Sequence, residues 1–289
     1  MAEFQRTRHA HYRHPSQVVL APPPYQVMAQ QDVVMEAPGG VSNVGLHLYE
    51  TGAYVHVGIC VSANCGCPLG GCGLSNGTVT ALHANHRNPE EDVVSNWLLT
   101  ETHEGEATPN AVYQRTTFRR WGMTNVEGAD VATIQGVDYT EANPEDYGDA
   151  YIVLGCRLSE VAGMGLERRF VRGHSFPCSL VFAFAPNVNY SPKWRRSSVL
   201  RRTYNGSMTR YERFLEAVAF AYMSALAALA ASSCDLAVLG AIGVGAAAGP
   251  HRVRIREDLP AVVANLLAGS LGPPFGLYFK RVVLVFTSA

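Results

Sequence analysis

Two adjacent glutamates, Glu90 and Glu91, are the side chains of this sequence best suited to proton transfer. They follow Pro89 and precede Asp92. Proline suits the first turn of a helix, and the helix dipole favours acids there, so the segment predicts a helix start. Neighbouring carboxylates also raise each other's proton affinity, which suits a general acid near neutral pH. The alternative is that Glu90, Glu91 and Asp92 have no catalytic role and only stabilise the helix start through the helix dipole.

A glycine-rich loop at residues 63–73 lies upstream of these glutamates. It follows an apolar, β-branched run, so it begins where a buried strand is expected to end. Asn64 can donate to and accept from a sugar hydroxyl, while glycines let the main chain approach a ring or a phosphate. The candidate ligand-binding residues of this loop are Asn64, Gly70, Gly71, Cys72 and Gly73.

The cysteines of this loop leave a second interpretation open. Cys65, Cys67 and Cys72, with His83 and His86 downstream, could hold zinc. Paired zinc ligands usually have at least two residues between them, whereas one residue separates Cys65 from Cys67. We therefore expect no bound metal and no cofactor, and interpret these thiols as small apolar fillers.

A second run of small residues, GAIGVGAAAG, occupies positions 240–249. Glycines there allow backbone N–H groups to surround an anion. The loop is not a P-loop, because the Gly-Lys-Ser/Thr that a P-loop requires does not follow it. It is not a dinucleotide-binding fingerprint either, because the strand after the next helix ends without the acidic residue that would bind a ribose hydroxyl. We expect a phosphate cradle built by Gly243, Val244, Gly245 and Ala246. A tight turn that needs only small residues is the simpler alternative.

The segments that must position these loops alternate between strand and helix patterns. Strands are expected at 53–62, 150–154, 180–185, 236–239 and 281–286, and helices at 208–232 and 257–267. This order indicates right-handed crossovers in a parallel or mixed sheet, with ligands at the carboxyl ends of strands. The sequence therefore predicts an α/β fold with a tail over 1–35, one domain over 36–289 and an acidic, loop-rich insertion at about 101–149.

The overall composition limits the classes of partner. The chain has 289 residues, of which 47% are hydrophobic, and this is enough to form a sizeable core. The formal net charge of -1 does not suit a protein that binds nucleic acid or a lipid surface. The apolar run 215–231 carries Glu216, so we expect no membrane span. Residues 1–17 lack an apolar core, so we expect no secretory signal peptide. Seven cysteines, an odd number, favour free thiols in the cytoplasm, with the nucleus also open.

Together, these motifs resemble those of macrodomains, specifically their poly(ADP-ribose) glycohydrolase-like branch. That branch has an asparagine and a glycine run after a strand, paired glutamates opening a helix, a later Ala-Pro-Asn and a Leu-Gly-Ala-x-Gly-x-Gly phosphate loop. The similar segments here are VSAN at 61–64, LGGCG at 69–73, PEED at 89–92, APN at 185–187 and LGAIGVG at 239–245. The order matches from about residue 40 onward, although Cys72 interrupts the glycine run.

The resemblance implies a three-layer α/β/α macrodomain-like mixed sheet and an ADP-ribosyl glycohydrolase activity. The substrates would be proteins modified with mono- or poly-ADP-ribose, and the enzyme would act as a monomer. Glu91 would serve as the acid/base and Glu90 as the acceptor of a ribose hydroxyl. Two other classes stay open: a non-catalytic ADP-ribose reader and a zinc-stabilised interaction domain.

Overall fold

The computed structural model describes residues 8–12, 18–63, 73–75, 78–80, 150–162, 169–184 and 211–286. Their main element is a seven-stranded sheet in the order β1-β6-β7-β3-β8-β9-β2. Its strands are β1 (Arg8–Tyr12), β2 (Gln30–Val34), β3 (Val57–Ala63), β6 (Ala150–Ala162), β7 (Arg169–Phe184), β8 (Leu236–Gly240) and β9 (Arg281–Val285). A separate antiparallel pair joins β4 (Gly73–Ser75) to β5 (Thr78–Thr80).

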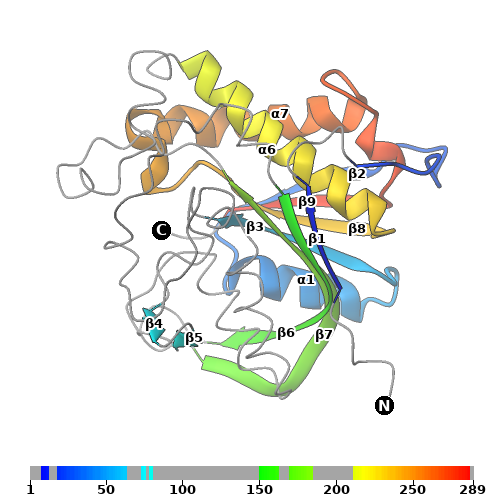
Figure 1. The fold of residues 1–289 in the computed structure, drawn as a ribbon, viewed down its shortest axis with the longest axis vertical. Helices are drawn as coiled ribbons and strands as arrows, with labels where there is room; N and C mark the ends of the chain where they lie inside the picture. The colour runs from blue at the N-terminus through cyan, green and yellow to red at the C-terminus, as the bar shows by residue number, and fades with distance from the viewer. Residues whose placement is uncertain are drawn as a thin grey trace.

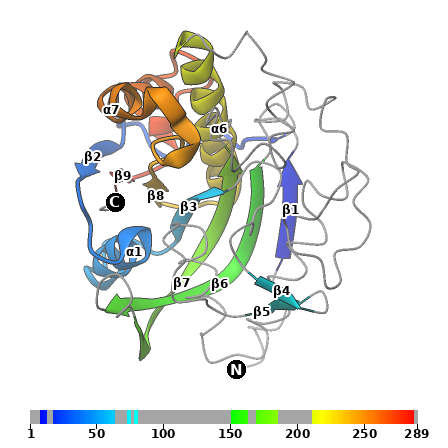
Figure 2. The same cartoon turned by 90° about the vertical axis from the view of Figure 1, so that its left-hand side faces the viewer.

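Helices cover both faces of the sheet. Helix α1 (Gly40–Glu50) lies on one face, and helices α6 (Tyr211–Ala231) and α7 (Arg252–Ala268) lie together on the other (Figures 1 and 2). Two short 3-10 helices, η7 (Ala246–His251) and η8 (Phe275–Leu277), flank α7 in the sequence. This arrangement confirms the predicted α/β class and the three-layer α/β/α organisation.

The strand directions define a single edge where ligands are expected. Strand β3 runs parallel to β7 and β8, and β9 runs parallel to β8 and β2. Strand β6 is antiparallel to its neighbours β1 and β7, which makes the sheet mixed. The carboxyl ends of the five parallel strands therefore lie at one edge of the sheet.

Strand β3 lies at the centre of the core and contacts helices on both faces. A Cβ added to Gly45 of α1 would lie 2.8 Å from the Ile59 side chain, so α1 comes very close to the sheet. On the other face, a Cβ added to Gly58 would lie 2.6 Å from Leu229 of α6. Cys60 then joins the buried cluster formed with α6 and α7. The alternation of side chains along a strand thus divides β3 between the two helical layers.

The structure differs from the expected tail over residues 1–35 at two places. Strand β1 pairs with β6, and strand β2 pairs with β9, so both belong to the main sheet. Each is only five residues long and holds few apolar side chains. Because their partners are far away in the sequence, no local pattern marked them as strands.

Several element boundaries also differ from the sequence-based expectations. Strand β3 begins at Val57, not at Ala53, and β7 spans Arg169–Phe184 where only 180–185 was expected. Helix α7 begins at Arg252, five residues before the expected start. Helix α1 was not predicted, because it opens with glycine and has no side-chain cap. Expected helical residues near Pro89 and the insertion at 101–149 lie outside the described residues.

Helix α6 is the one helix of the described chain that is long and apolar enough to cross a membrane by length and composition. Its window Phe214–Ala231 has a mean hydropathy of 1.8, and 67% of it is buried within the protein. Phe214, Tyr222 and Leu226 are completely buried against the sheet and α7. The packing of a core helix accounts for this apolar composition.

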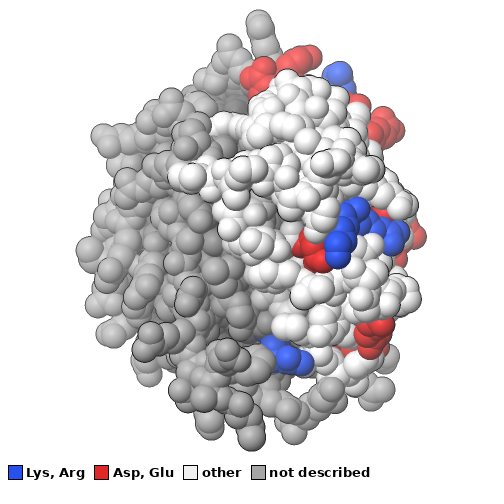
Figure 3. All heavy atoms as spheres, turned by 90° about the vertical axis from the view of Figure 1, so that its right-hand side faces the viewer, with Lys and Arg blue, Asp and Glu red and all other residues white. Residues whose placement is uncertain are grey.

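The described surface carries charges of both signs close together. Figure 3 shows Lys and Arg side chains near Asp and Glu on the displayed face, with wide uncharged areas between them. Two ion pairs of the described residues join Lys280 to Asp235 at 2.9 Å and Arg281 to Asp32 at 2.6 Å. The described part of the face in Figure 3 therefore lacks the broad single-sign field that would attract a polyelectrolyte.

His174 of β7 links two other elements through its ring. Its Nδ1 lies 2.6 Å from Glu160 of β6, and its Nε2 contacts the carboxylate of Glu50 at the end of α1. The hydrogen bond to Glu160, and then that to Glu50, raise the pKa of His174 above its ordinary value. When it is protonated, the ring carries a positive charge and fastens α1 to the β6–β7 pair.

We expect this contact to make stability fall as the pH rises. Since the folded state raises the pKa of His174, its contribution is complete below the unfolded-state pKa of about 6.5 and disappears as the pH passes the folded-state pKa. His174→Gln should remove that contribution. Melting temperatures of the parent and the variant, measured from about pH 6 to about pH 9, should converge with rising pH. A gap that stays constant over this range would contradict the assignment.

Candidate functional site

Three loops begin side by side at the carboxyl edge of the sheet. In the register of β3, Ala63 pairs with Phe184 of β7, and Cys60 pairs with Leu239 of β8. Asn64 follows β3 directly, and the Ala-Pro-Asn segment at 185–187 follows β7. The second glycine-rich loop follows β8. The topology thus places the starts of all three motifs on neighbouring parallel strands, where α/β proteins bind ligands.

The loop after β8 combines a buried first part with an open second part. The N–H of Ala241 donates to the carbonyl of Val285 at 3.0 Å, and the side chain of Ile242 is fully buried. Gly243 has a φ of +78°, a left-handed conformation that favours glycine. Gly245 is exposed, and a Cβ added there would meet nothing within 4 Å. The loop therefore presents accessible backbone next to a fixed anchor.

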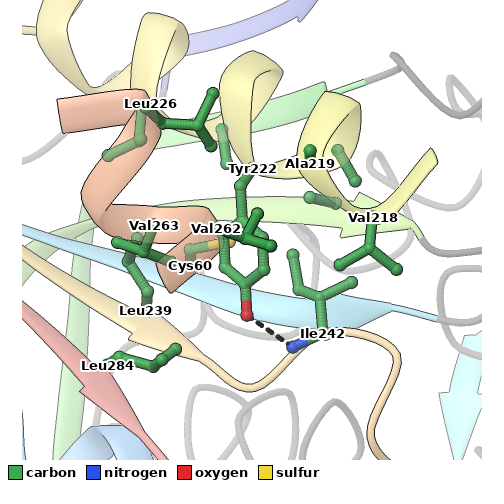
Figure 4. Packing of buried hydrophobic residues seen from close by; sticks show 14 of the residues in the cluster. Cys60, Val218, Ala219, Tyr222, Leu226, Leu239, Ile242, Val262, Val263 and Leu284 are labelled. Atoms are coloured by element: carbon green, nitrogen blue, oxygen red, sulfur yellow. Dashed lines mark hydrogen bonds between the residues drawn. The ribbon is translucent and has the colours of Figure 1, made fainter. Parts of the chain in front are cut away.

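The anchor is the hydroxyl group of Tyr222, a completely buried side chain of α6 (Figure 4). The hydroxyl donates to the carbonyl of Gly240 at 2.7 Å and accepts from the N–H of Ile242, also at 2.7 Å. Burial raises the pKa of Tyr222 well above its ordinary value, so the hydroxyl keeps its proton. One side chain thus fixes the two backbone groups at the exit from β8.

The far end of the loop is fixed by a cluster between α6 and α7. The ring of His251 lies 5.4 Å from the ring of Tyr211 and 5.3 Å from that of Phe214. Tyr211 donates a hydrogen bond of 2.6 Å to Asp258. The guanidinium group of Arg254 lies 3.9 Å from the centre of the Tyr211 ring. These contacts hold the segment from η7 into α7 against the start of α6.

The structure describes only part of the expected ligand-binding set. Gly243, Val244 and Gly245 form the loop after β8, and Ala246 begins η7. Gly73 is the first residue of β4. Outside the described residues lie Asn64, Gly70, Gly71, Cys72, Glu90 and Glu91, together with the zinc candidates Cys65, Cys67, His83 and His86.

Tyr222 was not among the residues selected from the sequence. The signal that could have found it is a hydroxyl-bearing side chain in the middle of an apolar, alanine-rich helix. A buried tyrosine needs a hydrogen-bond partner for its hydroxyl group. The sequence alone could not show that the partner is the phosphate loop expected after β8.

Three buried cysteines within the described residues form no disulfide: Cys60, Cys178 and Cys234. Burial raises the pKa of Cys60 and of Cys234 to about 12 in each case. Both thiols therefore stay protonated and behave as small apolar side chains, not as nucleophiles. The absence of a disulfide at these three residues agrees with the expectation of reduced thiols.

Tyr222→Phe should weaken ligand binding to the loop after β8. The variant keeps the ring but leaves a buried N–H and a buried carbonyl without their shared partner, which costs about 1–3 kcal/mol of stability. We expect a lower melting temperature and weaker binding of a diphosphate ligand, measured by calorimetry well below the melting temperature. The control is Tyr278→Phe, which loses a hydrogen bond to the carbonyl of Ala21 but spares Gly240 and Ile242. Equal affinities for the parent and Tyr222→Phe would show that the anchor does not shape the loop for binding.

Comparison with known proteins supports the fold described above. No family model matches the sequence, and no curated protein matches it. Among solved structures, poly(ADP-ribose) glycohydrolase from Thermomonospora curvata matches with a TM-score of 0.53 and 18% identity, over 96% of this chain and 78% of that one. A mutant of the Deinococcus radiodurans enzyme, in complex with ADP-ribose, matches with a TM-score of 0.60 and 13% identity, over 99% of this chain and 90% of that one.

A third structure, the Thermomonospora curvata enzyme bound to the inhibitor ADP-HPD, matches with a TM-score of 0.52 and 17% identity, over 96% of this chain and 78% of that one. The chain therefore shares the fold of these poly(ADP-ribose) glycohydrolase structures, in agreement with the resemblance of the sequence motifs. At these identities the likeness defines the fold. The chemistry must be argued from the site.

Proposed function

We propose that this protein is an ADP-ribosyl glycohydrolase that removes ADP-ribose from modified proteins. The observation that carries the proposal is the anchored glycine loop after β8, which begins beside the Asn64 loop at one sheet edge. Two of the similar structures hold ADP-ribose or the inhibitor ADP-HPD. A diphosphate needs backbone donors and a ribose needs a hydroxyl partner, and the two loops offer both.

The proposed binding mode assigns one part of the ligand to each loop. Backbone N–H groups around Gly243 and Gly245 hold the diphosphate, because Gly245 is open to an approaching ligand. Asn64 and the glycine run Gly70, Gly71, Cys72 and Gly73 hold the distal ribose. The bond at C1″ of this ribose then lies on the β3 side of the diphosphate.

The proposed chemistry requires one carboxyl group that changes its protonation state. Glu91 protonates the leaving oxygen or nitrogen as the C1″ bond breaks through an oxocarbenium-like transition state. The carboxylate then accepts a proton from the water that attacks C1″. Glu90 accepts a hydrogen bond from a ribose hydroxyl and orients the sugar. Free ADP-ribose and the unmodified side chain are the products.

The first test is binding of ADP-ribose itself. We expect saturable binding in calorimetry and a higher melting temperature, because a ligand at about 100 times its Kd stabilises the folded state by about 2.7 kcal/mol. NADH should give no redox turnover. Failure to bind at millimolar ADP-ribose would contradict the proposal. Release of ADP-ribose from mono- and poly-modified proteins then separates the enzyme from a non-catalytic reader, which binds without turnover.

The zinc-stabilised interaction domain is tested separately by metal content. The double variant Cys65→Ser and Cys67→Ser should fold normally, and neither it nor the parent should hold stoichiometric zinc. One tightly bound zinc per parent chain, absent from the variant, would favour the interaction domain.

A further inference from the structure

Strand β2 is the last strand of the main sheet, and one of its two sides is open. Its only neighbour in the sheet is β9, and Figure 2 shows β2 at the outer end of the strand order. The N–H of Phe286 donates to the carbonyl of Val34 at 2.9 Å, so the backbone groups of Val34 point toward β9. Because these directions alternate along a strand, the backbone groups of Gln31, Val33 and Met35 point away from β9. We call these three residues the open edge of β2.

The open edge has unpaired backbone groups and no feature that blocks pairing. Within the described residues, its backbone groups make no hydrogen bond outside the β2–β9 ladder. Edge strands of natural proteins often carry a proline, a lysine or a bulge that prevents another strand from joining them. The sequence QQDVV has no proline or lysine, and its register with β9 has no interruption. Its one charged residue, Asp32, is paired with Arg281 at 2.6 Å.

The open edge also exposes apolar side chains. Val33 is 41% exposed and Met35 is 51% exposed. Gln31 lies on the same face of the strand, and its side chain donates to the carbonyl of Pro260 in α7 at 3.0 Å. Helix α7 therefore covers the start of β2 but leaves Val33 and Met35 in solvent. Exposed apolar side chains beside unpaired backbone groups are typical of an interaction site.

A second copy of β2 fits the open edge in an antiparallel register. With Val33 of both copies on a two-fold axis, Gln31 of each copy lies opposite Met35 of the other. Each of these opposing pairs can exchange two backbone hydrogen bonds, because the groups of both strands point toward each other. The open edge is therefore self-complementary, as a two-fold symmetric interface requires.

The charges of the strand select this register. Asp32 of each copy then lies opposite Val34 of the other, and Glu36 lies opposite Gln30, so no two carboxylates oppose each other. The smallest shift that keeps the open-edge groups facing each other is two residues. Such a shift places Asp32 opposite either Asp32 or Glu36 of the other copy, and like charges directly opposite each other are destabilising.

We propose that two copies of this chain associate through β2, so that their main sheets continue across the two-fold axis. This dimer differs from the monomer that the resemblance implied. Because the two β2 strands are antiparallel, the carboxyl edges of the two sheets face in opposite directions. The loop after β8 is separated from the interface by β9 and β2, so dimer formation should leave ligand binding unchanged.

The test is the mass of the full chain in solution, measured by sedimentation from about 1 to about 100 µM. We expect the parent to change from one copy to two over this range. Val33→Lys should weaken association by at least about tenfold, because two lysines then oppose each other on the axis. The matched control is Val55→Lys, which makes the same change at a valine that is 81% exposed outside β2. It should associate as the parent does.

A mixture of charge variants tests the register itself. Val33→Glu should also weaken association when it is measured alone. An equimolar mixture of Val33→Lys and Val33→Glu should form a mixed dimer, because opposite charges then meet on the axis. This recovery requires residue 33 of one copy to lie directly opposite residue 33 of the other.

Three results would overturn the inference. The first is a parent that stays a single copy at every concentration; slow deuterium exchange of the Val33 and Met35 N–H groups would then show that the same chain covers the open edge. The second is a dimer that Val33→Lys does not weaken, which would place the interface elsewhere. The third is a mixture of the two charge variants that forms no dimer.

Discussion

Glu91→Gln should lower the rate of ADP-ribose release from modified protein by about 10²–10⁴-fold, the usual value of general acid–base catalysis. Glutamine has nearly the same shape and still accepts a hydrogen bond, but it cannot transfer a proton. The affinity for ADP-ribose should therefore stay close to that of the parent. The measurements are single-turnover release of ADP-ribose and calorimetric binding on the same preparation.

Glu90→Gln is the matched control for this prediction, because the two glutamates are adjacent in the sequence. A residue that only orients a ribose hydroxyl should show a smaller rate loss, accompanied by weaker binding. The reverse ranking would exchange the two roles. Full activity of the double glutamine variant would place the chemistry on another carboxylate, with Asp92, Asp130 and Asp138 next to be tested.

Gly245→Glu should abolish ADP-ribose binding. The position is exposed, and a Cβ there would meet no atom within 4 Å, so the protein itself can accommodate a side chain. A carboxylate about 4 Å from a phosphate charge costs about 4 kcal/mol at an effective dielectric constant of about 20. That energy corresponds to about a thousandfold loss of affinity. Calorimetry on a variant with an unchanged melting temperature measures the effect.

Gly245→Gln provides the control for size, because it is isosteric with the glutamate variant but uncharged. It should bind more tightly than Gly245→Glu. Gly243 is a poorer position for this test, since its φ of +78° makes any side chain strained whether or not a ligand binds. If Gly245→Glu keeps an affinity within a few-fold of the parent, the loop has a structural role only.

The sequence was most informative where the signal was local. Apolar strand patterns followed by glycine runs predicted β3 and β8 and the edge from which their loops emerge, and the structure confirms both strands as parallel neighbours. Helix α6 and strand β9 were recognised for the same reason, since their apolar residues follow the expected periodicity. The α/β class follows from these elements together.

Features that depend on contacts between distant residues could not be predicted. Strand β2 reads QQDVV, and only its pairing with β9 makes it a strand. The role of Tyr222 depends on the packing of α6 over the loop after β8, which periodicity does not encode. Helix α1 can approach the sheet closely because residue 45 is glycine. Glycine has a low helix propensity, so the same residue makes the helix harder to recognise from the sequence.

The pairing of β2 with β9 affects how the protein folds during its synthesis. Gln30 pairs with Arg281, so the partners are 281 − 30 = 251 positions apart. At about 5–20 residues per second, a ribosome needs roughly 13–50 s to reach the partner of β2. During that interval β2 has no strand to pair with, and contacts of such long range also slow folding. The sheet therefore closes late, and an exposed, partly apolar strand must be kept from other nascent chains until β9 arrives.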